Sequence, residues 1–309
     1  MSTFQRNLPT KLITKLKEEE PLFKNHLLPD IEAGTVFPAI RGRYICFYHK
    51  GSRLFKYQSG NFSTHVLFGF VPAQGDGNGE FREGKLGETP PIASFCEGYE
   101  AIKKRAADHA KYAKPEAKGV SDLHRFSPFN TGRAAGERRY VLLDTEITFN
   151  SKDIKAEASG TADPDPKHKT DRLDLVLYDT RDRRLLFCEA KHFSNGEYWS
   201  GEVAQQIARY NRQLENWEAI LKQYGNYVDD MNALFGTDLP RPTGIQKECG
   251  LFFLGFDQEE KRIKDAFEEA EAGAYLEKLP YYAIGDPSGK KFKISTLWNR
   301  LKRSDIYGT

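Results

Sequence analysis

Two acidic residues and a lysine on neighbouring predicted strands are the residues of this sequence best suited to chemistry. Asp174 lies in the strand predicted over Arg172–Tyr178, and Glu189 and Lys191 lie in the strand predicted over Arg184–Lys191. Because side chains alternate along a strand, Glu189 and Lys191 point to one face, and an antiparallel hairpin would bring Asp174 to the same face. Two converging carboxylates form an oxygen site suited to Mg²⁺. A lysine beside them can hold or deprotonate a water, or neutralise charge on a phosphate, so the group predicts metal-assisted hydrolysis of a phosphodiester.

The elements around these strands alternate between helical and strand periods. A helix predicted over Glu202–Tyr224 places Gln206 and Tyr210, four residues apart, on one helix face. The nearly all-apolar run Gly250–Phe256 is typical of a buried central strand. The order helix, three strands, helix, strand therefore runs through Phe95–Ala113, Tyr140–Phe149, Arg172–Tyr178, Arg184–Lys191, Glu202–Tyr224 and Gly250–Phe256. The remaining predicted elements are an acidic helix and a C-terminal pair, at Gln258–Ala272, Tyr281–Ile284 and Ser295–Leu301.

The spacing of the acidic residues and the lysine resembles the signature of the PD-(D/E)XK nuclease superfamily. Here Asp174 is followed, after a spacer of 14 residues, by Glu189-Ala190-Lys191. Gln206 and Tyr210 are similar to the QxxxY motif of the RecB and λ-exonuclease-like branch of that superfamily. The resemblance covers about half the chain. It implies an α/β (α+β) fold, with a restriction-endonuclease-like core whose central mixed sheet is flanked by helices.

The resemblance also implies a role for each matching position. It implies that Asp174, Glu189 and the backbone carbonyl of Ala190 bind Mg²⁺ or Mn²⁺. Lys191 would position or activate the attacking water, and cleavage would leave a 5′-phosphate. The strict motif has a proline before the aspartate, whereas Leu173 stands there in this sequence.

Gln206 and Tyr210 would support the site or contact the substrate phosphate, again by resemblance. Tyr210 also belongs to the apolar stripe of its helix, so a purely structural role in the core is the alternative. For Glu189 and Lys191 the alternative is an exposed strand face with an ion pair worth at most about 1 kcal/mol.

The resemblance implies a further acidic residue, for which the sequence offers more than one candidate. Glu97 and Glu100 lie at the start of the first predicted core helix. Glu146 is the other candidate metal ligand, because with Asp144 it alternates against the apolar residues of its strand. Those apolar residues are Val141, Leu143, Ile147 and Phe149.

Composition excludes several classes of protein. The chain has 309 residues, with 46 Lys and Arg against 44 Asp and Glu, so net charge alone does not drive binding to polyanions. The sequence has no apolar run of about 18 residues, so it does not predict a membrane-spanning helix. The four cysteines are scattered without disulfide-framework or metal-ligand spacing, which favours a reducing, cytoplasmic location. Gly285–Lys291 lacks the spacing of a P-loop, so no ATPase motif is evident.

We expect two domains. Residues 1–91 predict an N-terminal β-rich accessory domain that ends in a linker rich in Gly and Pro. Its strands are predicted over Tyr44–Tyr48, Arg53–Tyr57 and Thr64–Phe70, separated by turn clusters at His49–Ser52 and Gln58–Asn61. Residues 92–309 would form the nuclease-like domain with a C-terminal extension.

The hypothesis is a Mg²⁺- or Mn²⁺-dependent nuclease that hydrolyses DNA, in bacterial defence against foreign DNA or a restriction-like system. Locally basic stretches favour a polyanionic substrate: residues 101–139 hold ten Lys or Arg against four Asp or Glu. An RNA or single-strand nuclease is one alternative, and a catalytically silent nucleic-acid-binding subunit is another. Compatible partners are DNA or RNA, a separate ATPase or helicase subunit, and further copies of the chain, but no membrane.

Overall fold

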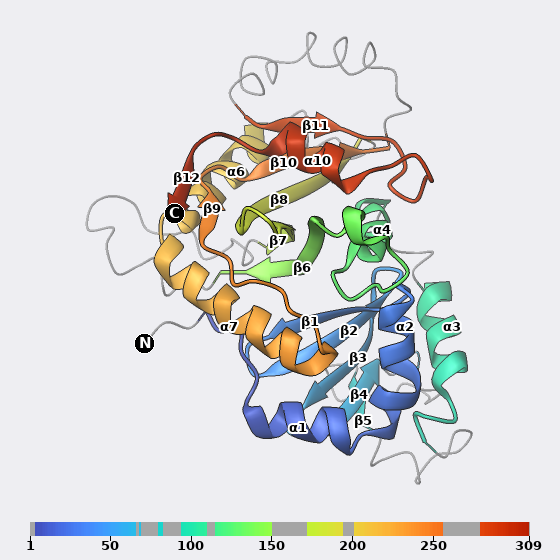
Figure 1. Ribbon diagram of the computed structural model, residues 1–309. Coiled ribbons are helices and arrows are strands. Elements are labelled where there is room, and N and C mark those ends of the chain that lie inside the picture. Colours follow the sequence, from blue (N-terminus) through green and yellow to red (C-terminus); the bar gives the residue numbers. More distant parts are fainter. Residues whose placement is uncertain are drawn as a thin grey trace, which may run out of the picture. The chain divides into compact units, whose positions relative to one another are not determined.

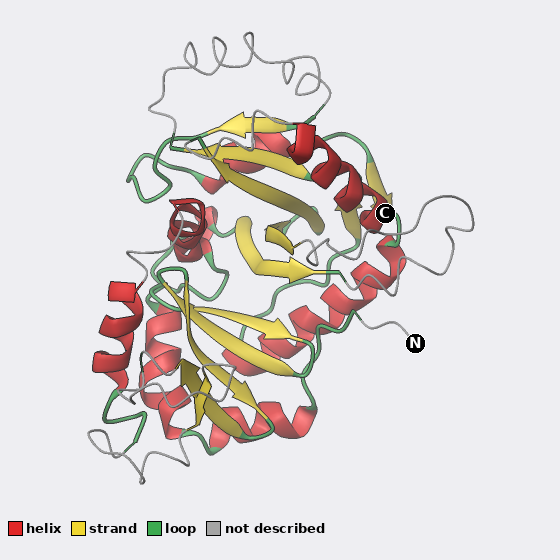
Figure 2. Ribbon diagram, turned by 180° about the vertical axis from the view of Figure 1, so that it is seen from behind, coloured by secondary structure: helices red, strands yellow, loops and turns green. Residues whose placement is uncertain are grey.

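The computed structural model describes residues 4–65, 68, 80–82, 94–109, 115–149, 172–193, 201–255 and 279–308. The chain forms two compact units, each with its own sheet (Figures 1 and 2). The N-terminal unit comprises Arg6–Ala134 and Asn226–Leu239, and the C-terminal unit comprises Met1–Gln5, Ala135–Gly225 and Pro240–Thr309. The fold is therefore of the mixed α/β class.

The N-terminal unit is built on a five-stranded antiparallel sheet in the order β1-β2-β3-β4-β5. The strands are β1 Phe37–Arg41, β2 Tyr44–His49, β3 Ser52–Gln58, β4 Asn61–His65 and β5 Glu80–Arg82. The helices are α1 Thr10–Glu18, the π-helical turn η1 Phe23–Leu27, α2 Leu28–Glu32, α3 Tyr99–His109, α4 Pro115–Asp122 and the 3₁₀ turn η4 Leu123–Phe126. Aromatic side chains of the sheet, Phe47, Phe55 and Phe62, pack together in its core.

Both turn clusters predicted in this sheet are confirmed as tight hairpin turns. The loop Lys50-Gly51 joins β2 to β3, and Ser59-Gly60 joins β3 to β4. All four residues have φ between 47° and 80°. Such left-handed pairs match the twist of the flanking strands, which is why glycine occupies the second position of each turn.

The C-terminal unit is built on a mixed seven-stranded sheet with the main order β11-β10-β8-β7-β6, in which β9 pairs with both β8 and β12. The strands are β6 Tyr140–Thr148, β7 Arg172–Asp179, β8 Arg184–His192, β9 Gly244–Gln246, β10 Gly250–Leu254, β11 Tyr281–Ala283 and β12 Ile306–Gly308. The helices are the 3₁₀ turn η5 Ala135–Glu137, α6 Gly201–Leu214, α7 Trp217–Phe235 and α10 Ile294–Leu301. β6, β7 and β8 run antiparallel, whereas β8, β10 and β11 run parallel. A parallel pair needs a long crossover, and α6 and α7 lie in the chain between β8 and β10.

Helices cover both faces of this sheet. Tyr224 of α7 packs edge-on against Phe187 of β8 at 5.6 Å between ring centroids. Trp298 of α10 packs against Tyr140 of β6 at 5.5 Å. Phe187 is paired with Val176 of β7, and Tyr140 is paired with Asp179 of β7. Val176 and Asp179 are three residues apart, so their side chains point to opposite faces of the sheet. Helices α7 and α10 therefore lie on opposite faces.

Several element predictions agree with the structure. The strands predicted at the centre of the chain correspond to β6, β7 and β8, and the run beginning at Gly250 corresponds to β10. The predicted helix Glu202–Tyr224 is two helices, because α6 ends at Leu214 and α7 begins at Trp217. Apolar residues continue at helical spacing across that break, at Leu214, Trp217 and Leu221, which hides it from the sequence pattern. The acidic helix predicted over Gln258–Ala272 lies outside the described residues.

The expected domain boundary at residue 91 does not coincide with the division into compact units. Residues 92–134 belong to the N-terminal unit, and so does the end of α7. The reason is packing: α3, which was expected as the first core helix of a nuclease domain, contacts β2 and β3 of the N-terminal sheet. Within the described ranges, no helix is long and apolar enough to cross a membrane.

Candidate active site

The sheet of the C-terminal unit opens between β7 and β8. Among the described residues, the paired register of these strands runs from Asp179↔Arg184 to Leu175↔Cys188 and ends there. β7 nevertheless stays paired with β6 as far as Arg172, and β8 stays paired with β10 as far as His192. We call this opening, beyond the pair Leu175–Cys188, the β7–β8 fork.

Asp174 lies at the start of the β7–β8 fork and bridges it with its side chain. Its Oδ2 accepts a hydrogen bond from the backbone N–H of Ala190 at 2.7 Å. In an extended strand the N–H and C=O of one residue point to the same neighbouring strand. The carbonyl of Ala190 therefore also points toward the β7–β8 fork, as a metal-binding carbonyl would need to.

Glu189 and Lys191 flank Ala190 and form a buried ion pair. Lys191 Nζ lies 2.6 Å from Glu189 Oε1, and the two residues are only 7% and 2% exposed. The alternation of β8 puts both on the face of Phe187, which α7 covers. The pair is therefore not a solvated strand face, and a buried ion pair is weak as a device for stability alone.

Helix α6 contributes Gln206 and Tyr210. Gln206 Nε2 donates to Tyr210 Oη at 2.8 Å, and Tyr210 is fully buried. Burial raises the pKa of Tyr210, and the negative charge of Glu189 raises it further, with a smaller contribution from Asp174. The tyrosine hydroxyl thus shares an electrostatic environment with both carboxylates. The core role and the site role of Tyr210 are compatible in this arrangement.

Glu146 of β6 lies across the ladder from Asp174. It falls between the pairs Thr145↔Leu175 and Ile147↔Leu173, and its backbone is left-handed, with φ of 52°. Its carboxylate forms an ion pair with Arg172 at 3.6 Å, where its side chain is 37% exposed. Glu146 is therefore close to the β7–β8 fork in register, but its carboxylate is directed to Arg172.

A β-bulge interrupts the alternation of β6 before Asp144, whereas the register from Asp144 to Thr148, which includes Glu146, is unbroken. The register of β6 shifts between Leu142 and Asp144, so Val141 and Ile147 do not share a face as the sequence pattern indicated. Asp144 is buried and its Oδ2 accepts a hydrogen bond from Tyr224 Oη at 3.1 Å. Asp144 therefore joins sheet to helix.

The other two candidates for the additional acid belong elsewhere. Glu97 precedes α3 and Glu100 lies in its first turn, and both are in the N-terminal unit. They are not part of the group assembled on β7, β8 and α6. Within the described part of the chain, no three His, Cys, Asp or Glu side chains are grouped so that they could hold a metal ion.

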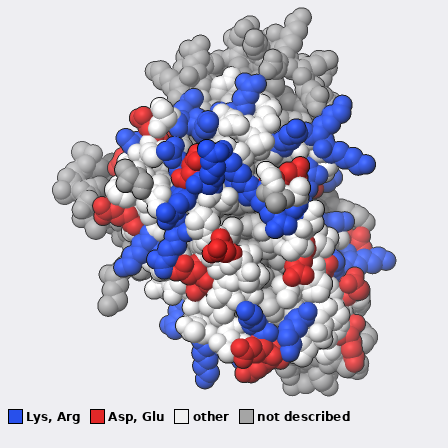
Figure 3. Space-filling view, viewed as in Figure 1, with Lys and Arg blue, Asp and Glu red and all other residues white. Residues whose placement is uncertain are grey.

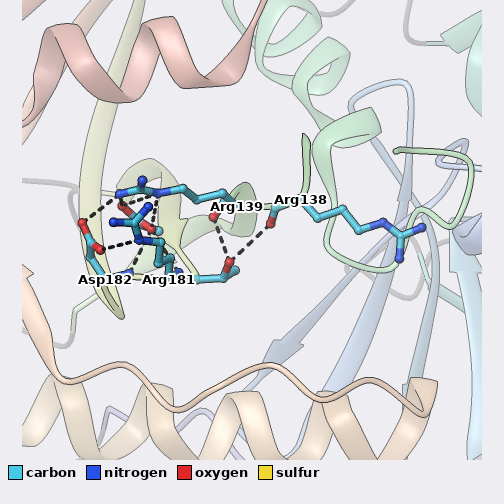
Figure 4. A network of polar contacts seen from close by, with 6 residues as sticks. Arg138, Arg139, Arg181 and Asp182 are labelled. Carbon is cyan, nitrogen blue, oxygen red and sulfur yellow. Dashed lines mark hydrogen bonds and ion pairs between the residues drawn. The ribbon is translucent and has the colours of Figure 1, made fainter. Parts of the chain in front are cut away.

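The closed end of the hairpin carries an arginine–aspartate network that sequence reasoning identified only as a turn (Figure 4). The Arg139 guanidinium donates to both carboxylate oxygens of Asp179, the shortest contact being 2.7 Å, and to Asp182 at 2.8 Å. Burial of Asp179 opposes its ionisation, but the hydrogen bonds from Arg139 and from the turn outweigh it and lower its pKa. The network clamps β6 to the β7–β8 turn. A signal for it exists in the sequence, since Arg139 precedes a strand and Asp179 ends the next one.

Basic side chains are prominent on the visible face of the C-terminal unit (Figure 3). Exposed basic residues of this unit include Arg183, Arg241, Lys302 and Arg303. Most of the basic stretch 101–139 belongs instead to the N-terminal unit.

The chain was compared with protein-family models, with curated proteins and with solved structures, and none of them matches. The geometry of the β7–β8 fork therefore carries the functional argument.

Proposed function

We propose that the C-terminal unit is a metal-dependent nuclease with a restriction-endonuclease-like core. One observation carries the proposal: the sheet opens at the residues expected to do chemistry. At the β7–β8 fork, Asp174 binds the backbone between Glu189 and Lys191, and those two side chains form a buried ion pair. A buried ion pair contributes little to stability by itself, so its position beside the Asp174 carboxylate supports a functional role.

The donor set fits Mg²⁺ or Mn²⁺. Asp174 and Glu189 offer carboxylate oxygens, and Ala190 offers a carbonyl oxygen directed to the β7–β8 fork. When bound, such an ion polarises a phosphoryl oxygen and lowers the pKa of a coordinated water. Two carboxylates and one carbonyl leave room for water and substrate oxygens, as Mg²⁺ sites in phosphate-processing proteins require.

The protein's own groups would position the ligands and stabilise charge on the phosphate. The Ala190 N–H holds the Asp174 carboxylate in place, and Lys191 orients Glu189. The Lys191 ammonium supplies positive charge against the charge that develops on the phosphate, or orients the attacking water. Gln206 and Tyr210 support this group from α6.

The proposed substrate is DNA, cleaved to leave a 5′-phosphate, and the proposed setting is bacterial defence or a restriction-like system, inside the cell. A stand-alone nuclease with an unfamiliar second unit is commonly found in such systems, which is an argument by analogy. Phosphate contacts do not read base or sugar identity, so RNA and single strands belong in the assay. A separate ATPase or helicase and a second copy of the chain are compatible partners.

The test is a cleavage assay on closed-circular, linear and single-stranded DNA and on RNA, with Mg²⁺, Mn²⁺ or EDTA. Lys191→Gln is compared with Lys222→Gln, which changes an exposed lysine of α7. We expect metal-dependent cleavage that falls by at least about a hundredfold in Lys191→Gln, the usual size of a general acid–base contribution. We expect wild-type rates in Lys222→Gln, and nicking of closed circles would show endonuclease action.

Thermal melting of each variant shows whether it is folded, so that loss of activity is read only from folded protein. Wild-type activity in folded Lys191→Gln would contradict the assignment of the site. Absence of cleavage together with Mg²⁺-dependent stabilisation that Asp174→Ala removes would favour the silent binding subunit.

A further inference from the structure

The loop between β11 and α10, residues 284–293, concentrates exposed positive charge in the C-terminal unit. Residues 281–303 hold six Lys or Arg against one acidic residue, although the whole chain is nearly balanced at 46 against 44. Lys290, Lys291 and Lys293 belong to this loop, and all three are exposed. The chemistry proposed at the β7–β8 fork uses none of them.

The topology of the sheet places this loop at the same end of the sheet as the β7–β8 fork. β8, β10 and β11 run parallel, and Lys191, Phe253 and Ala283 lie side by side in their register. Neighbouring strands are about 4.8 Å apart, so the backbone of Ala283 is about 10 Å from that of Lys191, two strands away. Because β11 ends at Ala283, the loop leaves the sheet at the carboxyl ends of the parallel strands, where ligands bind in open α/β sheets.

Both ends of the loop stay at that end of the sheet. The backbone N–H of Gly255 donates to the carbonyl of Gly285 at 3.5 Å, which ties the start of the loop to the end of β10. A Cβ on Gly250, the first residue of β10, would lie 3.1 Å from Leu301 Cβ, so α10 ends over the beginning of β10. The helix is about 12 Å long and β10 about 16 Å, so α10 begins toward the carboxyl end of that strand. Figure 1 shows the loop beyond that end of α10, and Figure 3 shows Lys and Arg side chains gathered in this region.

Hydrogen bonds within the loop hold it in a defined shape and engage its one acidic side chain. The Asp286 carboxylate accepts hydrogen bonds from the backbone N–H of Ser288 at 2.8 Å and from the Ser288 hydroxyl at 2.6 Å. The N–H of Gly289 donates to the carbonyl of Asp286, and that of Phe292 to the carbonyl of Gly289, both at 3.1 Å. An ordered loop loses less conformational entropy on binding, so it is suited to present its lysines to a partner.

We infer that the β11–α10 loop binds the phosphate backbone of a nucleic acid, next to the phosphate that is cleaved at the β7–β8 fork. This rests on the proposed function for the nature of the partner and adds to it a binding surface. Three lysines within four residues match the closely spaced charges of a duplex, one per about 1.7 Å of its axis. Lysine contacts phosphates as a point charge and does not read bases, so the loop gives affinity without sequence preference. The substrate then runs from the β7–β8 fork across the ends of β10 and β11.

The test compares two double variants that change the charge equally. The loop variant combines Lys290→Gln with Lys291→Gln. The matched control combines Lys302→Gln with Arg303→Gln, because these exposed neighbours follow α10 at the opposite end of the sheet. Binding of fluorescein-labelled duplexes of different sequence is followed by anisotropy in EDTA over a series of salt concentrations, and thermal melting shows that each protein is folded.

In the loop variant we expect Kd to rise on every duplex. The slope of log Kd against log salt concentration should fall by about 1.8, at about 0.9 for each lost phosphate contact, and the control should keep the wild-type slope. EDTA removes the metal, so this result is independent of cleavage and can hold where the nuclease assay fails. Absence of DNA binding by the wild type, an unchanged slope in the loop variant, or an equal loss in the control would overturn the inference. Poly-glutamate bound as tightly as DNA, and lost in the loop variant, would assign the loop to an acidic polypeptide instead.

Discussion

At the residue scale, two aspartates of one strand have different tasks. Asp174 accepts a hydrogen bond from the Ala190 backbone at the β7–β8 fork, whereas Asp179 is clamped by Arg139 at the closed end of the hairpin. The clamp is shown by its contacts to be structural. The Asp174 carboxylate is half-buried beside a buried ion pair. Removing charges from water costs free energy, so this position argues against a role in stability alone.

We predict that Asp174→Asn separates metal binding from stability. An amide oxygen still accepts the Ala190 N–H, so the free energy of unfolding should change by less than about 1 kcal/mol. Calorimetric titration with Mn²⁺ should show binding to the wild type and little to the variant. Asp179→Asn should do the reverse, costing about 2 kcal/mol through its lost charged hydrogen bonds while leaving Mn²⁺ binding intact. Unchanged Mn²⁺ affinity in Asp174→Asn would rule out Asp174 as a ligand.

At the scale of elements, two glycines differ in whether the fold has space for a larger side chain. Gly225 lies inside α7, where a Cβ would be in ordinary contact, 3.7 Å from Arg241 Cδ. Gly255 directly follows β10, has a left-handed backbone and leaves no space for a Cβ. Only the second position requires glycine.

We predict that Gly225→Ala stabilises α7 by about 0.5–1 kcal/mol, because alanine has the higher helix propensity and meets no clash. The urea midpoint followed by tryptophan fluorescence should rise, since Trp217 begins the same helix. Gly255→Ala is the opposite case, and its midpoint should fall. A lower midpoint for Gly225→Ala would show that the middle of α7 needs the conformational freedom of glycine.

At the scale of the whole molecule, each of the two compact units has its own sheet, and the titrating and fluorescent side chains are divided between them. His124, in the N-terminal unit, is buried and stacks on Phe37 at 4.8 Å between centroids. Burial, with a smaller effect of His49, lowers the pKa of His124 to about 3. The three tryptophans of the sequence, Trp199, Trp217 and Trp298, all belong to the C-terminal unit.

We predict that acid selectively weakens the N-terminal unit. The unfolded His124 binds a proton below pH 6.5 and the folded one only near pH 3. Its contribution to stability is therefore full above pH 6.5 and is lost as pH falls, by about 1.4 kcal/mol per pH unit. Urea denaturation at pH 7 and pH 5 should show this loss by far-UV circular dichroism but not by tryptophan fluorescence.

The control for this prediction is His124→Phe, which keeps an aromatic ring and removes the titrating group. The variant should lose less stability than the wild type between pH 7 and pH 5. Comparison of the two is needed because Asp230, whose burial raises its pKa to about 6, stabilises the same unit as pH falls below 6. An identical pH dependence in the two proteins would show that His124 does not carry the effect.

The sequence by itself determined the local features of this protein. Alternation and turn residues predicted β7 and β8, the hairpin between them and the tight turns of the N-terminal sheet. These features depend on neighbours along the chain, so a single sequence contains them. The set Asp174, Glu189, Lys191, Gln206 and Tyr210 was also selected from the sequence, by spacing and by resemblance to a known signature, and its elements lie in one unit. Its role as a metal site stays a prediction.

Only the tertiary structure decided the features that depend on contacts between distant segments. Beyond the pair Leu175–Cys188, the pairing of β7 with β8 ends while β7 stays paired with β6 and β8 with β10. The bulge in β6 moved Asp144 into contact with Tyr224, which no alternation rule foresees. α3 joined the N-terminal sheet although the order of elements had assigned it to the nuclease core. Helical periodicity shows that a helix has an apolar face, but which sheet covers that face is settled by packing across the whole chain.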